Sequence, residues 1–218
     1  MARKSDRKFA PENRKAKRRG RVAAKETSIL LPIRIPRGRQ AIWSLVIAAA
    51  AIICYWNTKD CGFVRWDDTG YITKNPLVIG DGGLKAIWTD ILRDDPVKIY
   101  YPLVWTSYWI EYKFFEGDAA GYHLVQMVLH AMASVAVFLA VAALGAPLIA
   151  AAATGLLFAV HPINVASAAW LAERKNTLSA VFFWLALFAD VHYRRRSLRF
   201  SFRSLPKRRV WCWRRSCW

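Results

Sequence analysis

Residues 122–144 read YHLVQMVLHAMASVAVFLAVAAL, and this stretch of 23 residues contains no Asp, Glu, Lys or Arg. An α-helix rises about 1.5 Å per residue, so roughly 20 apolar residues cross a hydrocarbon core about 30 Å thick. His123 and His130 are seven residues apart, about two turns, and therefore share one helix face. The stretch predicts a membrane-spanning helix whose histidines face away from lipid.

Three further stretches are apolar enough to be candidate spans, at residues 41–56, 147–170 and 177–193. The last is the weakest, because Asp190 and a histidine lie near its end. His161–Pro162 lies late in the third, where proline removes a backbone donor and bends or ends the helix. We predict an all-α polytopic membrane protein with about four transmembrane helices.

Basic residues are concentrated at the two ends of the 218-residue chain, which has a net charge of +18 although 55% of its residues are hydrophobic. Residues 1–40 hold 14 Lys or Arg and 3 Asp or Glu, and residues 194–218 hold 10 and none. This segregation argues against a disordered basic protein and against a plain DNA-binding domain. Because flanking Lys and Arg stay in the cytoplasm, both termini are predicted to be cytoplasmic.

The predicted organisation has three parts: a basic disordered tail (1–40), a transmembrane region (41–193) with a long outer loop (57–121), and a second basic tail (194–218). A signal anchor is favoured over a cleaved signal peptide, whose charged region is far shorter. The first tail could bind nucleic acid or acidic lipid, but a solvated tail that fixes topology is favoured, and no nucleic-acid partner is expected. The four cysteines show no CxxC metal spacing.

The outer loop begins CGFVRWDDTGYITKNP and places two adjacent acids, Asp67 and Asp68, between Trp66 and Tyr71. A carboxylate at the membrane surface can act as a general base or bind a cation. A solvated acidic turn is the alternative. Adjacent side chains rarely point at one substrate atom, so we expect one acid to be catalytic and the other structural.

Two interfacial helices are predicted in the same loop. Residues 83–92 form an amphipathic pattern, and the aromatic-rich residues 100–115 have a helix-starting proline at Pro102. Most of the aromatic side chains are expected to be packed core. The residues expected on one face of the first helix are Leu84, Ile87, Trp88 and Ile91.

A charged turn, WLAERKN at residues 170–176, is predicted to return to the outer surface. Positive charge there is contrary to the usual distribution, which suggests a function. Arg174 and Lys175 could bind a lipid-linked phosphate, Arg as a bidentate fork and Lys as a point charge. The alternative is a helix-capping charge cluster in which Glu173 offsets its neighbours.

These elements, in this order over residues 63–185, resemble the N-terminal membrane region of the transmembrane-and-tetratricopeptide-repeat O-mannosyltransferases and their bacterial relatives, of the GT-C class. Each motif is weak alone, but their common order is a strong signal. The matching residues are Phe63–Asp68, Tyr71–Ile72, Asn75–Pro76, Gly83–Leu84, Ile87–Trp88, Tyr101–Leu103, Ser107, Gly117, Gly121–Leu124, Leu129–His130, Phe158–Ile163 and Trp170–Lys175.

The resemblance implies a transferase that moves a sugar, mannose in the named family, from a polyprenyl-phosphate donor to an acceptor hydroxyl of a protein or glycan outside the cytoplasm. It implies Asp67 or Asp68 as general base, with inversion, and Arg174 and Lys175 at the donor phosphate. Metal use varies in the class. One acidic pair without a third ligand does not define a metal site, so no metal ligand is assigned and the use of a divalent ion stays open. The residues expected to line the cavity are His123, His130, His161 and Tyr101.

Family members are far longer, with about ten or more spans and 34-residue repeats that this chain does not contain. We therefore expect an N-terminal fragment of a GT-C fold. Residues 194–218 change composition abruptly and suggest out-of-frame translation or a truncated product, with a cationic membrane-surface tail as the alternative. The rival functions are a non-catalytic membrane protein whose tails bind anionic lipid or nucleic acid, and an inactive remnant. The Arg/Ala-rich composition favours a bacterial plasma membrane over an endoplasmic reticulum.

Overall fold

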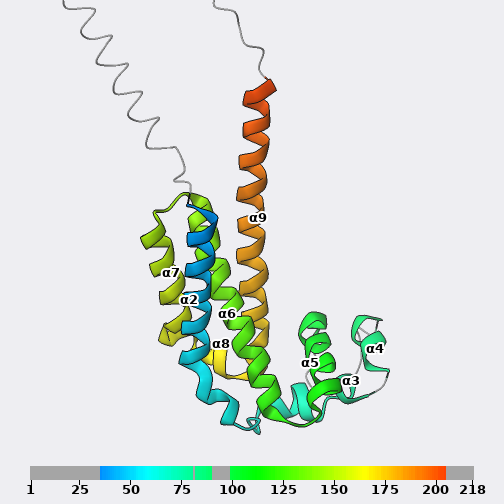
Figure 1. Ribbon diagram of the computed structural model, residues 1–218. Coiled ribbons are helices and arrows are strands. Elements are labelled where there is room, and N and C mark those ends of the chain that lie inside the picture. Colours follow the sequence, from blue (N-terminus) through cyan, green and yellow to red (C-terminus); the bar gives the residue numbers. More distant parts are fainter. Residues whose placement is uncertain (1–34, 81, 90–98, 205–218) are drawn as a thin grey trace, which may run out of the picture.

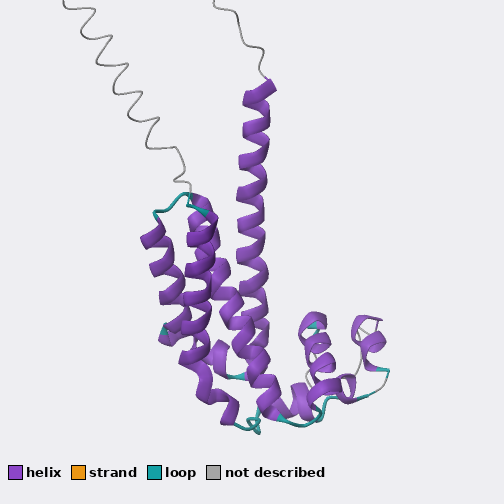
Figure 2. Cartoon of the chain, viewed as in Figure 1, coloured by secondary structure: helices purple, strands orange, loops and turns teal. Residues whose placement is uncertain are grey.

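The computed structural model describes residues 35–80, 82–89 and 99–204, and every regular element in these ranges is helical (Figure 2). The predictions for residues 1–34, Ile91 and the end of the second basic tail, 205–218, fall outside them. Four helices lie side by side in a bundle, with the start of the first and the end of the last at the same end (Figure 1). They are α2 (Arg37–Tyr55), α6 (Ala119–Leu144), α7 (Leu148–Val160) and α9 (Arg174–Ser204).

The other elements lie mainly at the opposite end of the bundle, where α3, α4 and α5 stand to one side (Figure 1). Before α6 these are η1 (Trp56–Asp60), η2 (Thr69–Thr73), α3 (Pro76–Ile79), α4 (Gly83–Thr89) and α5 (Pro102–Phe115). Between α7 and α9 they are η3 (Pro162–Asn164), α8 (Val165–Ala169) and η4 (Leu171–Glu173).

Helix α6 is the central element, because it packs against α2, α7 and α9. It begins where the Asp118 side chain accepts a hydrogen bond from the Ala120 amide at 3.1 Å, and it ends at Gly145, whose φ of 103° suits a residue without a Cβ. Its 26 residues correspond to about 39 Å, enough to cross a bilayer. His123 and His130 are 4% and 2% exposed, so both face the protein, as the spacing predicts.

Two described helices are long and apolar enough to cross a membrane, Arg37–Asp60 and Ala119–Leu144. The segments Leu148–Val160 and Pro162–Ala169 meet at His161 with a bend of 48°. Taken together as one broken span, they make a third candidate. The bend confirms that the His161–Pro162 pair interrupts this helix. The fold is thus an all-α membrane fragment, whereas a fourth span at 177–193 stays a prediction, because α9 is not among the helices that meet this test.

Small residues let the spanning helices approach closely. Gly155 of α7 faces α2 and α6, and a Cβ built there would lie 2.9 Å from Ile47 Cδ1 and 2.9 Å from Phe138 Cβ. Both of these neighbours are fully buried. In lipid, where helix association depends on van der Waals packing, such contacts hold the bundle together. Helix α9 continues past residue 193, so residues 194–204 of the predicted second tail are helical.

Candidate functional site

The outer loop folds into a unit that packs against the start of α6 and the segment before α9. Helix α5 begins at Pro102, as predicted, and its Trp105 and Tyr108 are buried in a core shared with Tyr122 and Leu171. The expected packing of the aromatic residues is therefore confirmed for these side chains. Of the face predicted for α4, Ile87 is 1% exposed, whereas Leu84 and Trp88 are 38% and 48% exposed, and the interfacial position of this helix stays a prediction.

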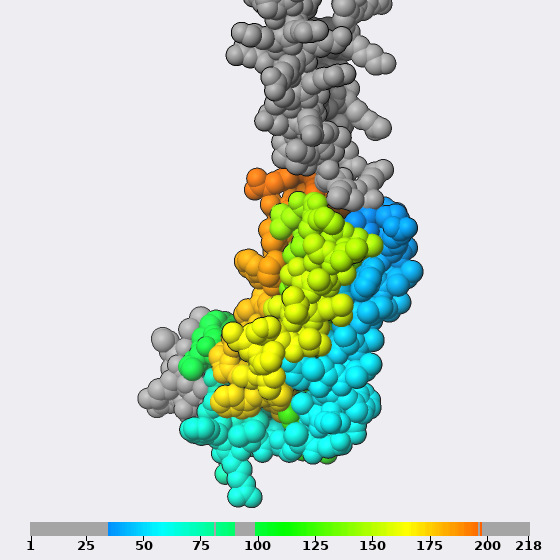
Figure 3. Space-filling view, turned by 90° about the vertical axis from the view of Figure 1, so that its left-hand side faces the viewer, coloured from blue at the N-terminus to red at the C-terminus, as the bar shows by residue number. Residues whose placement is uncertain are grey.

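The two adjacent acids have opposite environments. Asp67 is exposed, whereas Asp68 is fully buried. Asp68 Oδ2 accepts a hydrogen bond from the Val64 amide at 2.9 Å, and Oδ1 accepts one from the Ala172 amide at 3.0 Å. The second bond joins residues 104 positions apart and brings the acidic pair to the turn before α9. Figure 3 shows the yellow segment after α7 lying against the cyan residues that follow α2.

Burial raises the pKa of the Asp68 carboxyl above its ordinary value, because the charged form loses water. The amides of Val64 and Ala172 oppose the rise, as does the nearby His123, while the charge of Asp67 adds to it. Such a carboxylate is suited to holding two chain segments together. Asp67 is the member of the pair that solvent can reach.

Lys175 and Glu173 form a half-buried ion pair in the turn that Asp68 holds, with 2.7 Å between Lys175 Nζ and Glu173 Oε1. Lys175 Nζ also lies 3.4 Å from the Ala172 carbonyl oxygen. Burial opposes the charged form of Lys175, but the hydrogen bond and the charge of Glu173 outweigh it and raise the pKa of the ammonium. Two of the three ammonium donors thus have partners in the described part of the chain.

Tyr71 marks the point where the loop and the turn meet. Burial raises the pKa of its hydroxyl, with Lys175 opposing the rise and Tyr101, Asp67 and Glu173 adding to it. These four groups therefore lie within electrostatic range of one buried phenol. Asp68 and the turn before α9, which are distant in sequence, are thus joined at the end of the bundle opposite the start of α2.

Arg174 has no exposed area. Its Nε donates to Gln126 Oε1 at 2.9 Å and its Nη2 to the Tyr122 carbonyl at 3.1 Å. Its Nη1 donates to Ser107 Oγ at 3.2 Å and to Glu111 Oε1. The predicted contact with a donor phosphate requires the guanidinium to turn away from protein partners, and it stays a prediction.

The four residues predicted to line a cavity occupy different places. His123 and His130 are buried on α6, and His130 Nε2 lies 3.0 Å from the Ala159 carbonyl oxygen. Neither ring nitrogen of His123 has a hydrogen-bond partner of ordinary geometry among the described residues. His161 is exposed, and its Nδ1 accepts from the Ile163 amide at 3.2 Å. Tyr101 is half-buried beside the outer-loop core.

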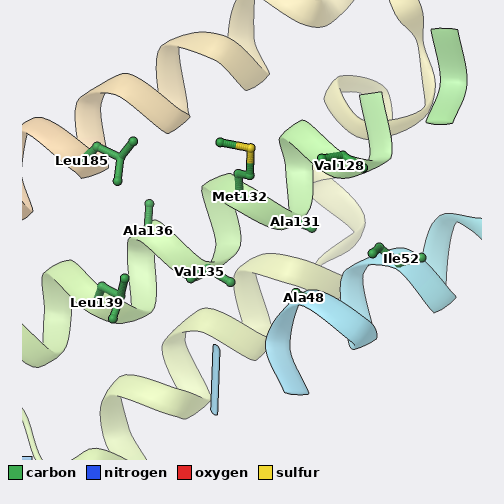
Figure 4. A pocket seen from close by; sticks show the side chains of 9 residues that line it. All are labelled: Ala48, Ile52, Val128, Ala131, Met132, Val135, Ala136, Leu139 and Leu185. Carbon is green, nitrogen blue, oxygen red and sulfur yellow. The ribbon is translucent and has the colours of Figure 1, made fainter. Parts of the chain in front are cut away.

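An apolar groove of about 360 Å³ lies elsewhere, between α2, α6 and α9 (Figure 4). None of the four predicted cavity residues lines it, and it belongs to the membrane-spanning part of the bundle. No group of three His, Cys, Asp or Glu side chains that could hold a metal ion occurs in the described ranges. The residues that line the groove are Ala48, Ile52, Val128, Ala131, Met132, Val135, Ala136, Leu139 and Leu185.

Sequence comparison finds several curated relatives. The chain is 32% identical over 150 residues to the protein O-mannosyl-transferase TMTC3 of Homo sapiens and 33% identical over 164 residues to Tmtc1 of Drosophila melanogaster. It is 29% identical over 170 residues to the protein O-mannosyl-transferase F38B6.6 of Caenorhabditis elegans. The matches cover 66%, 72% and 72% of this chain. The chain is a relative of the TMTC-type protein O-mannosyl-transferases.

The resemblance to these O-mannosyl-transferases, predicted from separate motifs, is therefore confirmed by alignments over 150 to 170 residues. The matched segment is 16% of the length of human TMTC3, 19% of Drosophila Tmtc1 and 24% of the Caenorhabditis protein. The chain thus spans about a quarter or less of these TMTC-type relatives. No family model and no solved structure matches it.

The residues around Arg174 were not predicted as site residues from the sequence of this TMTC relative. Glu111 is an acid within a helix of aromatic residues, and Gln126 is an uncharged polar residue within the stretch 122–144. Each is an ionisable or polar side chain in apolar surroundings, which is a signal that could have been used. Tyr108 carries no such signal, because hydroxyls are common in interfacial helices, and Ser107 is among the residues of the resemblance but had no predicted role.

Proposed function

We propose that this chain carries the acceptor-activating part of a membrane glycosyltransferase. The enzyme transfers a sugar, mannose, from a polyprenyl-phosphate donor to a Ser or Thr hydroxyl of a protein on the non-cytoplasmic side. The names of the relatives support the sugar and the acceptor. The apolar helices support a membrane location, which we propose to be a bacterial plasma membrane with both termini in the cytoplasm.

The hydrogen bond from the Ala172 amide to Asp68 is the observation that carries this proposal. It joins Asp68, the neighbour of Asp67, to Ala172, which precedes Lys175 by three residues, and so supports a site in which a general base and a cation act together. A transfer from a lipid phosphate needs both, because a proton must leave the acceptor while negative charge develops on the leaving group. Asp68 is buried and doubly hydrogen-bonded, which leaves Asp67 as the base.

In the proposed reaction the Asp67 carboxylate takes the proton of the acceptor hydroxyl. The hydroxyl oxygen then forms a bond to the anomeric carbon of the sugar, and the bond between that carbon and the phosphate oxygen breaks. The electron pair of the broken bond remains on the lipid phosphate, which faces Lys175. Because attack and departure occur on opposite faces of the carbon, the anomeric configuration is inverted.

The test is a transfer assay with the chain reconstituted in lipid vesicles. Radiolabelled polyprenyl-phosphate mannose is the donor, a Ser/Thr-rich unfolded polypeptide is the acceptor, and NMR of the product gives the anomeric configuration. We expect label on the polypeptide with the configuration inverted. Transfer with retention would contradict the direct displacement, and absence of transfer would contradict the proposed activity of this chain.

A further inference from the structure

Arg174 joins three segments that are far apart in sequence. Its guanidinium donates to Ser107 and Glu111 of α5 and, at the start of α6, to the Gln126 side chain and the Tyr122 carbonyl. Arg174 itself is the first residue of α9. Four of the five N–H groups of the guanidinium thus have protein acceptors. The side chain connects the outer loop, the central helix and the start of the last helix.

The buried charge of Arg174 is matched by its surroundings. Glu111 is 4% exposed and supplies the opposite charge, and the Tyr108 ring lies 4.4 Å from the guanidinium carbon. A planar guanidinium can make a fork of hydrogen bonds and stack on a ring at the same time, whereas an ammonium cannot. The site therefore requires arginine rather than a positive charge alone.

The turn next to Arg174 is tied to the outer loop at two further points. The Tyr108 hydroxyl donates to the Leu171 carbonyl, and the Ala172 amide donates to Asp68. Tyr108 is therefore in contact with both the guanidinium and the turn. Movement of α5 away from Arg174 displaces Tyr108, the donor of the first bond, and so releases Leu171, the residue next to the donor of the second bond. The geometry of Arg174 and the position of the acidic pair are thus coupled.

We propose that Arg174 is a positioning residue, whose guanidinium clamps α5 to the starts of α6 and α9 and so holds the 171–173 turn, whose Ala172 amide fixes Asp68 beside Asp67. It acts through the turn and does not contact the donor phosphate. The catalytic consequence rests on the proposed function, whereas the positioning is measurable without any activity. The coupling runs from Arg174 through the turn to Asp68 and from there to Asp67, the exposed residue beside it.

Kinetics separate positioning from phosphate binding. If Arg174 is a positioning residue, Arg174→Lys lowers kcat about tenfold or more and leaves the donor KM within about twofold, because the charge is kept and the fork is lost. If Arg174 binds the phosphate, the lysine retains most of kcat and the donor KM rises. The matched control is Arg65→Lys, the same substitution at an exposed residue of the outer loop, which is expected to change neither constant.

Amide hydrogen exchange tests the positioning directly. The full chain in lipid nanodiscs is labelled in deuterated buffer, and the Ala172 amide is resolved by fragmentation mass spectrometry. Arg174→Lys is expected to speed exchange of this amide about tenfold, because its hydrogen bond to Asp68 opens more often. Arg65→Lys is expected to leave the exchange rate unchanged. An unchanged rate in folded Arg174→Lys overturns the proposal.

Glu111→Gln provides a second variant if Arg174→Lys does not fold. It removes the charge that stabilises buried Arg174 while keeping the side-chain shape, so the Ala172 amide should again exchange faster. An unchanged rate in this variant also overturns the proposal. Faster exchange in a chain that transfers no sugar supports the positioning and contradicts the proposed function, so the two failures are distinguishable.

Discussion

Asparagine substitutions at the two adjacent acids should have very different effects on stability. Asp68→Asn replaces one carboxylate oxygen with an NH₂ group, which leaves either the Val64 or the Ala172 amide facing a donor. An unsatisfied buried donor costs about 1–3 kcal/mol, and a charge-assisted bond contributes about 1.5–3 kcal/mol. Burial raises the pKa of Asp68, so removal of the charge offsets part of this loss. We expect a net destabilisation of about 2 kcal/mol.

The assay is thermal unfolding of the purified chain in detergent, followed by circular dichroism of the helices. For a chain of this length about 2 kcal/mol lowers Tm by roughly 4–8 °C. The matched control is Asp67→Asn, which makes the same chemical change at an exposed position. Its effect should lie within about 0.5 kcal/mol, as for most surface substitutions.

Equal destabilisation by the two substitutions would refute the assignment of Asp68 as the buried clamp and Asp67 as the exposed base. A larger effect at Asp67 would reverse the two roles. Asp68→Ala gives a second measure, because it removes both acceptors and should cost about 3–5 kcal/mol. Recovery of stability in Asp68→Asn relative to Asp68→Ala would show that one of the two amide bonds is retained.

The remaining predictions concern the cation and the helix packing. Lys175→Gln should lower kcat about tenfold or more with a smaller change in the donor KM, because it removes a charge that stabilises the negative charge developing on the leaving phosphate; steady-state kinetics with polyprenyl-phosphate mannose checks this. Gly155→Ala should lower the free energy of unfolding by about 1–3 kcal/mol, since its Cβ meets Ile47 and Phe138. The control is Gly38→Ala, where a Cβ meets nothing within 4 Å and helix propensity favours alanine, so thermal scans should show no loss.

The sequence allowed prediction of those elements whose causes are local. The charge-free stretch 122–144 predicted α6, and Pro102 predicted the start of α5. The His161–Pro162 pair predicted the interruption after α7, because a proline affects the helix in which it lies. The seven-residue spacing of two histidines predicted their common burial. Each of these inferences depends on residues within one or two helical turns.

The partners of the charged side chains could not be predicted in the same way. Arg174 and Lys175 are adjacent and have the same charge, yet one is fully buried and the other is half-buried at the surface. What separates them is the packing of Glu111 and Gln126, 63 and 48 residues away in sequence. Periodicity says which residues share a helix face, but it does not say which helix lies opposite. The split between Asp67 and Asp68 depends on the tertiary structure for the same reason.

The transfer rate of the Asp67→Asn chain tests the central claim most directly. Wild-type, Asp67→Asn and Asp60→Asn chains are reconstituted in equal amounts, and transfer of mannose from the polyprenyl-phosphate donor is measured. Asp60 is an exposed acid of the same loop and is paired with Lys59 at 2.8 Å, so it controls for the loss of a surface charge. Loss of a general base should slow Asp67→Asn by about 100-fold or more and leave Asp60→Asn near the wild-type rate. Equal rates in all three chains would contradict Asp67 as the base.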